Sequence, residues 1–447
     1  MSRPNFLFII ADDHRHSAIG ALNIEAAQTP TLDQLLADGT GFTQAHIMGS
    51  TSGAVCMPSR GMLMTGQHLF DTSDPLPDAA PLLPELLWDS GYTTFATGKW
   101  HNRRGSFARC FAGGGKIFFG GMSDQYAVPV QDFDPGGAYS AEDSFIADGF
   151  STTVFADEMI GFLDSHKNTA QPFFAYISLT SPHDPRTPPA PFDKMYDPAD
   201  IALPANFAPE HPFDIGVRDI RDEVLAGYPR GEEEIRQHIA DYYGMISHQD
   251  MEIGRVLAAL SAKGLSENTI VVYTADHGLS VGQHGLMGKQ NLYDHSMRIP
   301  LILRGPGIAA GARCEARLYL HDLYPTLLEQ AGVPVPDSCA AQSIKPLLDD
   351  SQTSHREVIF SAYQGVFGHP GGAPYQRSIK DQRHKLILTW VAGVETWQLF
   401  DLATDPWETN DLIASADHAE TVADLKGKLR SQQRLVNDPV AGQDRAG

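Results

Sequence analysis

Two pairs of side chains have the donor types of a metal site. Asp12 and Asp13 follow one apolar run of the chain, and Asp276 and His277 follow another. Divalent cations such as Ca²⁺ and Mg²⁺ bind carboxylate oxygens, and an imidazole nitrogen is a further ligand. Either pair alone is better explained by a helix cap or by solvated acidic groups. Two such pairs at matched positions favour one shared metal site.

A lone cysteine, Cys56, is a candidate nucleophile. It stands two residues ahead of Pro58, which suits the first turn of a helix, so we predict that a helix begins here. The N-terminus of a helix attracts anions and lowers the pKa of a thiol. Three other cysteines lie in no recognisable motif and are expected to be structural: Cys110, Cys314 and Cys339.

Basic and imidazole groups also follow apolar runs. Lys99 and His101 come directly after a third run, and His183 comes after a fourth. Taken singly, such a lysine is usually a solvated charge and such a histidine a structural group. In an open α/β sheet, however, ligands bind beyond the carboxyl ends of the strands. We therefore expect these groups to meet the two metal-binding pairs in one site.

The four apolar runs are typical of buried strands in a mostly parallel sheet. They span residues 5–11, 92–97, 173–179 and 269–275. Helix-spaced apolar residues occupy the segments between them, at 29–39, 151–166 and 232–263. The alternation predicts an α/β fold with a large mixed, mostly parallel sheet sandwiched by helices.

Two domains are expected. Residues 102–150 are rich in glycine and aromatic residues and residues 184–230 in proline, and we predict that both form ordered loops over the strand ends. Past residue 350, short β-prone runs and an amphipathic stretch predict a smaller antiparallel sheet with a C-terminal helix. We assign residues 1–350 to a catalytic α/β domain and residues 351–447 to an α+β subdomain.

The composition excludes several classes of protein. The chain has 447 residues, of which 42% are hydrophobic and 20% charged, as expected of a large folded core. Its net charge of −22 and its lack of a basic run exclude a nucleic-acid partner. No apolar stretch approaches the roughly 20 residues that span a bilayer, so no membrane association is expected. We expect a cytoplasmic protein, or a periplasmic or secreted one if a signal peptide was removed.

The sequence around the cysteine carries a family resemblance. Cys56-Met57-Pro58-Ser59-Arg60 resembles the C-x-P-S-R signature of the type I sulfatases, which belong to the alkaline-phosphatase-like superfamily. The resemblance extends over most of the chain through the following segments: Asp12-Asp13, Gly98-Lys99-Trp100-His101, Asp276-His277-Gly278, His284-Gly285, Lys289 and Leu399-Phe400-Asp401-Leu402.

This resemblance implies a modified residue and a metal ion. A dedicated maturase would oxidise Cys56 to formylglycine. The ion would be Ca²⁺, with Mg²⁺ and Mn²⁺ as alternatives. The implied ligands are Asp12, Asp13, Asp276, His277 and the modified residue 56. Many sulfatases have asparagine at the position of His277, which leaves the identity of the ion open.

The resemblance also implies roles for the remaining groups. Arg60 would hold the hydrated formylglycine, and Lys99 and Lys289 would hold the sulfate oxygens. His183 would protonate the leaving alcohol. His101 would then remove a proton from the hydrate, so that sulfate is expelled.

Other residues near the expected pocket are candidates for substrate contacts. They are His284 and Arg186, and after them His14, Arg15, His16, Asn102, Arg103 and Asp184. The expected function is hydrolysis of a small or carbohydrate sulfate ester, with that ester and the maturase as partners. Two alternatives stay open: a phosphonate monoester or phosphodiester hydrolase of the same superfamily, and a sulfate-binding relative without catalysis.

Overall fold

The larger part of the molecule is built around one mixed sheet. The computed structural model describes residues 3–72, 76, 79–166, 171–348, 353–365 and 372–442. Within these residues the main sheet has the strand order β12-β2-β11-β10-β1-β9-β5-β6. The five strands from β10 to β6 are parallel, whereas β11 is antiparallel to both of its neighbours. The predicted α/β class, with its mostly parallel sheet, is confirmed.

The strands of this sheet are β1 (Asn5–Ala11), β2 (Thr40–Phe42), β5 (Thr93–Lys99), β6 (Gly113–Phe118), β9 (Phe173–Ser178), β10 (Thr269–Ala275), β11 (Leu301–Arg304) and β12 (Ala312–Cys314). Short strand pairs outside it are β3 (Ala45–His46) with β13 (Leu318–Tyr319), and β7 (Pro129–Val130) with β8 (Phe145–Ile146). All residues of β1, β9 and β10 are buried, which explains why these runs are apolar throughout.

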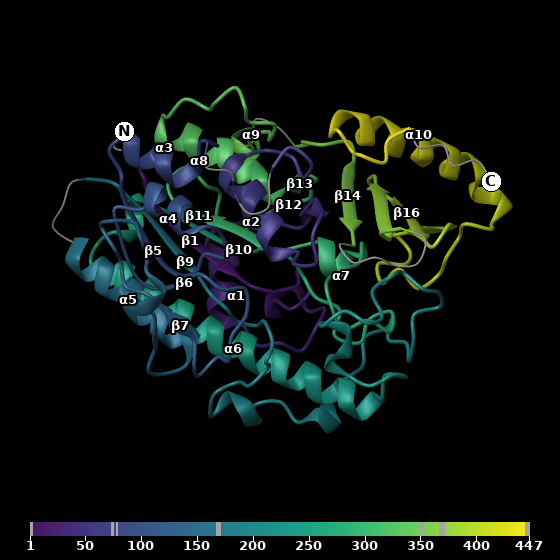
Figure 1. The fold of residues 1–447 in the computed structure, drawn as a ribbon, viewed down its shortest axis with the longest axis horizontal. Coiled ribbons are helices and arrows are strands. Elements are labelled where there is room, and N and C mark those ends of the chain that lie inside the picture. Colours follow the sequence, from purple (N-terminus) through teal and green to yellow (C-terminus); the bar gives the residue numbers. More distant parts are fainter. Residues whose placement is uncertain are drawn as a thin grey trace.

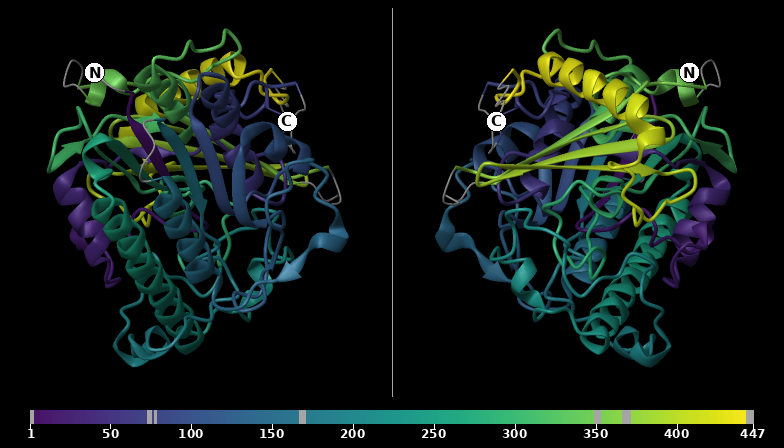
Figure 2. Two further views of the ribbon diagram at one scale, coloured as in Figure 1. Left: turned by 90° about the vertical axis from the view of Figure 1, so that its left-hand side faces the viewer. Right: turned by 90° about the vertical axis from the view of Figure 1, so that its right-hand side faces the viewer.

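Helices cover both faces of the sheet (Figure 1, Figure 2). On the upper side of Figure 1 lie α2 (Cys56–Thr65), α3 (Leu83–Asp89), α4 (Arg104–Cys110), α8 (Leu323–Ala331) and α9 (Lys345–Leu348). On the lower side lie α1 (Pro30–Asp38), α5 (Ser151–His166) and α6 (Glu232–Ala262). A single turn of helix, α7 (Asp294–Met297), sits near the C-terminal sheet. None of the helices in the described part of the chain is long and apolar enough to cross a membrane.

The predicted loop at 102–150 is partly wrong. It contains α4 and the edge strand β6, which pairs in parallel with β5. The glycine run at 113–115 lies in this strand because the backbones approach closely: a Cβ at Gly114 would lie 2.6 Å from the carbonyl oxygen of Ala96. The second predicted loop, 184–230, contains only short 3₁₀ turns.

A smaller sheet forms the C-terminal part. It has the order β17-β16-β15-β14-β4 and consists of β14 (Ile359–Gln364), β15 (Tyr375–Lys380), β16 (His384–Val391), β17 (Val394–Asp401) and β4 (Gly49–Ser50). The first four strands are antiparallel as expected, and α10 (Ala419–Leu435) packs on them. The fifth, β4, comes from the N-terminal part and pairs in parallel with β14. The predicted domain boundary at residues 350 and 351 lies outside the described residues.

Candidate active site

The predicted strand ends meet at one edge of the sheet. β1 pairs with β10 up to Ala11 and Ala275, so Asp12 and Asp276 leave the sheet side by side. The backbone N–H of Asp276 donates to the carbonyl oxygen of Ala11 at 3.2 Å. The backbone N–H of Asp12 donates to the carbonyl oxygen of Ser181 at 3.1 Å. Parallel pairing therefore brings together carboxylates that are more than 260 residues apart in the chain.

Cys56 enters this site at the first residue of α2. Its helix is tied to the strand ends because the Ser59 hydroxyl donates to the carbonyl of Asp276 at 2.6 Å. The thiol is 2% exposed, and its Sγ lies 3.2 Å from Nδ1 of His101 and 3.7 Å from Nζ of Lys99. Burial opposes ionisation of this thiol, but Lys99 and His101 together hold the pKa of Cys56 well below its usual value. Residue 56 thus lies in an electropositive, buried environment.

Six side chains form two adjoining groups of metal donors, which share Asp12. The donor atoms of Asp12, Cys56, Asp276 and His277 lie within 4.8 Å of one another, and Asp12, Asp13 and His183 form a second such group. Oδ1 of Asp12, Oδ2 of Asp13 and Nε2 of His277 are buried, and none has a hydrogen-bond partner among the described residues. Unpartnered buried carboxylate oxygens are costly unless a cation holds them. The donor set therefore fits a divalent cation.

Three buried cations balance the three carboxylates. Lys99 donates to Asp12 and to the carbonyl of Gly121, and Lys289 donates to Oδ1 of Asp13 at 2.8 Å. Burial alone would raise the pKa of the Asp12 carboxyl, but the nearby Lys99 ammonium lowers it well below its usual value. Burial alone would lower the pKa of Lys289, but the nearby Asp13 carboxylate raises it above its usual value. Together with Arg60, which is bonded to Asp276, the two lysines set three basic side chains against three carboxylates before any ion or substrate enters.

Arg60 is almost fully engaged in holding the site together. Its Nε donates to Asp276 at 2.9 Å, and Nη1 donates to the hydroxyl of Ser178 at 2.5 Å and to the carbonyl of Lys99 at 3.1 Å. Its Nη2 is buried without a hydrogen-bond partner in the described structure. Only this nitrogen remains for an oxygen atom on residue 56.

The two histidines of the site, His183 and His101, have different surroundings. Nδ1 of His183 lies 2.7 Å from the carbonyl of Asp184, which can only accept, so Nδ1 carries the proton and Nε2 faces Asp13 at 4.0 Å. Burial lowers the pKa of His183 to about 4, although Asp13 opposes this. His101 has a left-handed backbone (φ 50°). A Cβ at Gly121 would lie 2.5 Å from its Nε2, so the glycine-rich segment leaves room for this ring.

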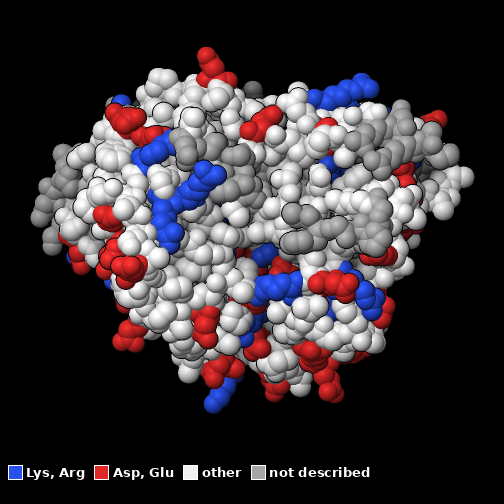
Figure 3. Space-filling model, in the orientation of Figure 1, with Lys and Arg blue, Asp and Glu red and all other residues white. Residues whose placement is uncertain are grey.

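A cavity of about 350 Å³ opens onto Cys56, and we call it the catalytic cavity. Its lining includes four predicted residues, namely Cys56, His101, His183 and Lys289. Several other lining residues were not predicted from the sequence: Met122, Ile220, Arg221, Asp222, Gln290 and Tyr363. On the face shown in Figure 3 the molecule is hollowed near its centre, and basic and acidic side chains gather there.

Asp222 is the most informative of the missed residues. It accepts a hydrogen bond from Gln290 at 2.8 Å and lies 4.0 Å from Nζ of Lys289. Asp222 and Arg221 come from an irregular loop without a motif, and Tyr363 is the penultimate residue of β14. No local pattern could have identified these residues, because only the fold brings them to the cavity.

Three predicted substrate-binding residues, Lys99, His284 and Arg186, do not line the catalytic cavity. Lys99 lies behind residue 56, with its Nζ 3.7 Å from Sγ of Cys56. His284 stacks on Tyr293 with ring centroids 3.8 Å apart, and burial lowers its pKa to about 3. Arg186 is buried, and its Nη1 lies 3.5 Å from Nδ1 of His238. Nε and Nη2 of Arg186 have no partner within the described residues. The geometry thus gives His284 a packing role, while the proximity of Arg186 to Asp13 and Asp222 keeps it near the site.

Comparison with known proteins adds family matches. A family model described as Sulfatase matches residues 4–333, and another described as N-sulphoglucosamine sulphohydrolase, C-terminal, matches residues 282–435. The chain is 26% identical to an N-acetylglucosamine-6-O-sulfatase of Bacteroides thetaiotaomicron, over 98% of this chain and 87% of that protein. It is 25% identical to an ulvan-active sulfatase of Formosa agariphila, over 99% of this chain and 83% of that protein.

Solved structures share the fold. One protein, in complex with its substrate D-glucosamine-2-N,6-O-disulfate, superposes with a TM-score of 0.82 at 23% identity, over 99% of this chain and 100% of that one. A phosphonate monoester hydrolase of Agrobacterium radiobacter superposes with a TM-score of 0.78 at 24% identity, over 97% of this chain and 96% of that one. These likenesses agree with the predicted architecture.

Proposed function

The chain belongs to the sulfatase family, and from this premise we propose that it releases inorganic sulfate from a small or carbohydrate sulfate ester through a formylglycine made from Cys56. The family match makes it a sulfate-ester hydrolase; the nucleophile and the substrate class are the proposal. The observation that carries it is the position of Cys56 at the start of α2, buried between Lys99, His101 and the carboxylates. Such an ester needs a nucleophile, positive charge on its oxygens and a proton for its leaving group.

We propose that the ion is Ca²⁺, held by Asp12, Asp13, Asp276, His277 and residue 56. The unpartnered carboxylate oxygens support this assignment, because hard cations favour oxygen ligands. The imidazole of His277 makes Mg²⁺ and Mn²⁺ the alternatives. When bound, the ion would supply positive charge to the sulfate oxygens and to the nucleophile.

The modified residue would offer chemistry that the thiol lacks, because a hydrated aldehyde carries two hydroxyl groups. His101 lies within hydrogen-bond distance of this position and would accept a proton there through Nδ1. Arg60 would donate from its one unpartnered nitrogen, Nη2, to an oxygen of residue 56. Its other nitrogens stay bonded to Asp276 and the strand ends, so the donor would be rigidly placed.

The lysines and His183 would act on the substrate. Lys289 donates to Asp13 and keeps further N–H groups for sulfate oxygens. Lys99 donates to Asp12 and to the Gly121 carbonyl, and its third N–H faces Sγ of Cys56 at 3.7 Å, so it would serve an oxygen bound at or beside residue 56. His183 lines the catalytic cavity and keeps Nδ1 bonded to the Asp184 carbonyl. It would deliver a proton from Nε2 to the leaving oxygen. The anionic substrate favours the protonated imidazole, against the effect of burial.

A sulfated saccharide is the substrate class that we favour. The two relatives described above are named for an N-acetylglucosamine sulfate and for ulvan. A cavity of about 350 Å³ has room for a sugar unit, and Tyr363 and Met122 give it an apolar wall. The fold similarity to a phosphonate monoester hydrolase keeps that reaction as the second candidate.

A paired steady-state assay tests the proposal. The chain, co-expressed with a formylglycine maturase, is given a nitrophenyl sulfate and the matching phenylphosphonate ester. We expect a larger kcat/KM for the sulfate, and a preference for the phosphonate would favour the second candidate. If neither ester reacts although mass spectrometry finds formylglycine at residue 56, a panel of sulfated monosaccharides follows. Sulfate binding without turnover of any ester would favour the non-catalytic alternative, and activity retained in Cys56→Ala would refute the nucleophile.

A further inference from the structure

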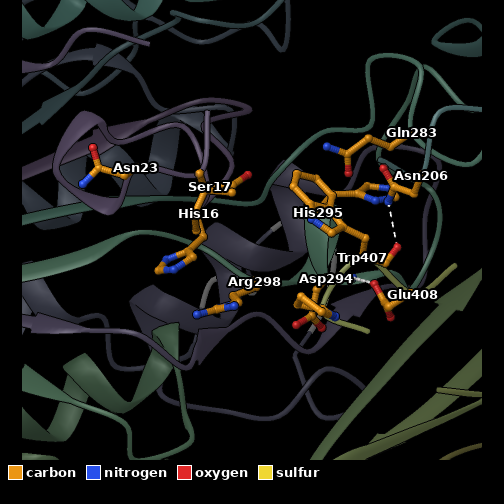
Figure 4. A pocket seen from close by; sticks show the side chains of 12 residues that line it. His16, Ser17, Asn23, Asn206, Gln283, Asp294, His295, Arg298, Trp407 and Glu408 are labelled. Carbon is orange, nitrogen blue, oxygen red and sulfur yellow. Dashed lines mark hydrogen bonds between the residues drawn. The ribbon is translucent and has the colours of Figure 1, made fainter. Parts of the chain in front are cut away.

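A second cavity, of about 370 Å³, lies outside the catalytic cavity and shares no lining residue with it. Figure 4 shows its walls: one side comes from the segment that follows β1, and the other from α7 and the three loops that hold Asn206, Gln283 and Trp407. Its lining includes the polar and aromatic side chains of His16, Asn206, Gln283, His295, Arg298 and Trp407. The reaction proposed above uses none of them.

Five buried polar atoms in this lining have no hydrogen-bond partner in the part of the chain that the structure describes. Four of them are Nδ1 of His16, Oδ1 of Asn206, Nε2 of Gln283 and Nδ1 of His295, and the fifth, Oε1 of Glu408, forms an ion pair with Lys385 at 2.8 Å. Each of these residues is less than one-tenth exposed. Because buried polar groups are nearly always bonded to protein, water or ligand, their gathering around one cavity indicates a bound polar molecule.

Neighbouring bonds determine which of these atoms donate and which accept. Nδ2 of Asn206 donates to the carbonyl of Trp407 at 3.0 Å, so Oδ1 is a free acceptor. The Ser280 hydroxyl donates to the Gly288 carbonyl at 2.6 Å, so it accepts from Nε2 of His295 at 2.9 Å. Nδ1 of His295 is then an acceptor as well.

Gln283 adds a donor through Nε2, so the cavity wall mixes donors with acceptors. Hydroxyl groups both donate and accept, and a sugar presents several of them on one ring. An arrangement of neutral amides and imidazoles around a cavity of this size therefore fits a sugar better than it fits an apolar ligand.

Arg298 supplies a positive charge to the same cavity. Its Nε donates to the carbonyl of Thr43 at 2.6 Å, and no ion pair is found for it among the described residues. The nearby carboxylate of Asp294 is already bonded to Lys380 at 2.6 Å and to Lys385 at 2.9 Å. The terminal nitrogens of Arg298 thus suit a planar or tetrahedral anion.

Trp407 supplies a flat apolar surface. It lines the cavity, is partly exposed and packs against no other aromatic ring within the described residues. A large aromatic face beside polar groups is suited to the apolar face of a sugar ring.

We propose that this second cavity binds an acidic sugar unit. The ring would lie on Trp407, its hydroxyls would bond to Gln283, Asn206 and His295, and its carboxylate or sulfate would bind Arg298. The bound unit is separate from the sulfate being hydrolysed. A free sugar acid and a distant unit of a longer saccharide present the same chemistry.

The test measures binding of D-glucuronate and D-glucose to the full-length protein by isothermal titration calorimetry. Glucuronate should bind, and glucose should bind at least about tenfold more weakly. Trp407→Ala should weaken glucuronate binding at least about tenfold, whereas Tyr363→Ala, an aromatic substitution in the catalytic cavity, should not. Arg298→Gln should remove the preference for glucuronate. Failure of glucuronate to bind, or loss of its binding in Tyr363→Ala alone, would overturn the proposal.

Two further measurements complete the test. Thermal unfolding shows whether Trp407→Ala is folded, and Gln283→Ala serves as a second probe if it is not. A tetrasaccharide that contains glucuronate separates the two sources of ligand. If the tetrasaccharide binds more tightly than the monosaccharide, and both Trp407→Ala and Tyr363→Ala weaken its binding, the ligand is a distant unit of a longer saccharide. If the tetrasaccharide binds as tightly as the monosaccharide and only Trp407→Ala weakens its binding, the ligand is a free sugar acid. If Trp407→Ala does not change tetrasaccharide binding, the proposed site is contradicted.

Discussion

At the scale of single residues, the catalytic cavity is a set of opposed charges that hold one another in place. Lys99 and Lys289 are bonded to the carboxylates that an ion would also contact, so each is positioned before a substrate arrives. Preorganised charges of this kind stabilise a transition state without reorganisation during the reaction. The geometry therefore assigns separable tasks to the histidines and to the carboxylates, and each can be tested alone.

Replacement of His183 by alanine should act through the leaving group. An alkoxide needs a proton as it departs and a nitrophenolate does not, so His183→Ala should lower kcat/KM about 10²- to 10⁴-fold for an alkyl or sugar sulfate. The loss for nitrophenyl sulfate should be far smaller. Steady-state kinetics of both esters with the same enzyme preparation provide the internal control. Equal losses for the two would show that His183 is not the general acid.

Removal of the ion should reduce stability as well as activity. Without it, the carboxylates of Asp12, Asp13 and Asp276 keep unpartnered oxygens or crowd one another. Dialysis against a chelator should abolish turnover and lower the melting temperature, and Ca²⁺ should restore both. At a hundredfold excess over Kd the expected stabilisation is about 3 kcal/mol. A melting temperature that does not respond to chelator or to Ca²⁺ would contradict a resident ion.

At the scale of elements, the long helix α6 holds the segments around the site. Its Tyr242 hydroxyl donates to the carbonyl of Asp13 at 2.7 Å and so fixes the turn after β1. Two turns further along, Asp250 accepts the backbone N–H groups of Thr31 and Leu32, each at 2.8 Å. Asp250 thereby caps the N-terminus of α1, where Pro30 has no N–H to offer. One helix thus fixes the turn after β1 and the start of α1 through buried polar contacts.

This cap should make stability depend on pH. Burial raises the pKa of Asp250 from 3.8 to about 6, although the two N–H donors oppose it. The folded state therefore binds a proton more tightly than the unfolded state, and the free energy of unfolding should fall as pH rises from about 4 to about 6. Relative to Asp250→Asn, the fall should be about 3 kcal/mol. Urea unfolding of both proteins across this range is the measurement, and a constant difference between them would refute it.

At the scale of the whole molecule, the C-terminal sheet is part of the site. Strand β4, which leads to Cys56, pairs with β14, and the apolar cluster beneath them joins Met48 and Met62 to Phe360 and Leu425. Tyr363 reaches the catalytic cavity from the same sheet. The C-terminal sheet therefore shares an apolar cluster with α2 and contributes a wall of the catalytic cavity.

A chain that ends at residue 350 should not be an independent catalytic domain. Loss of β14 leaves β4 unpaired and exposes the apolar face of α2 at Met62, so we expect reduced solubility, a less cooperative thermal transition and no turnover. Calorimetry and the nitrophenyl sulfate assay measure these effects. Tyr363→Ala is the matched control, since it should keep the full-length fold and change KM. A cooperative, active truncated chain would instead support the predicted boundary.

The sequence alone determined the secondary-structure elements that have a clear local pattern, and the residue types available for chemistry at their ends. Continuous apolar runs are needed wherever a parallel strand is buried on both faces, so β1, β5, β9 and β10 were predictable to within two residues. Donor types at matched strand ends likewise indicated the metal-binding pairs, and the C-x-P-S-R resemblance drew attention to Cys56 and Arg60. Strand β6 was missed because its three glycines have low strand propensity, and pairing with β5 overrides that preference.

Only the tertiary structure decided which side chains share a cavity. Asp222, Tyr363 and Arg298 come from a loop without a motif, a small sheet and the end of a single helical turn, and no spacing in the sequence relates them to Cys56 or to one another. It also removed His284 from the catalytic cavity by stacking it on Tyr293. The physical reason is that local spacing fixes secondary structure, whereas long-range packing and the register of β1 against β10 and of β4 against β14 fix which distant groups meet.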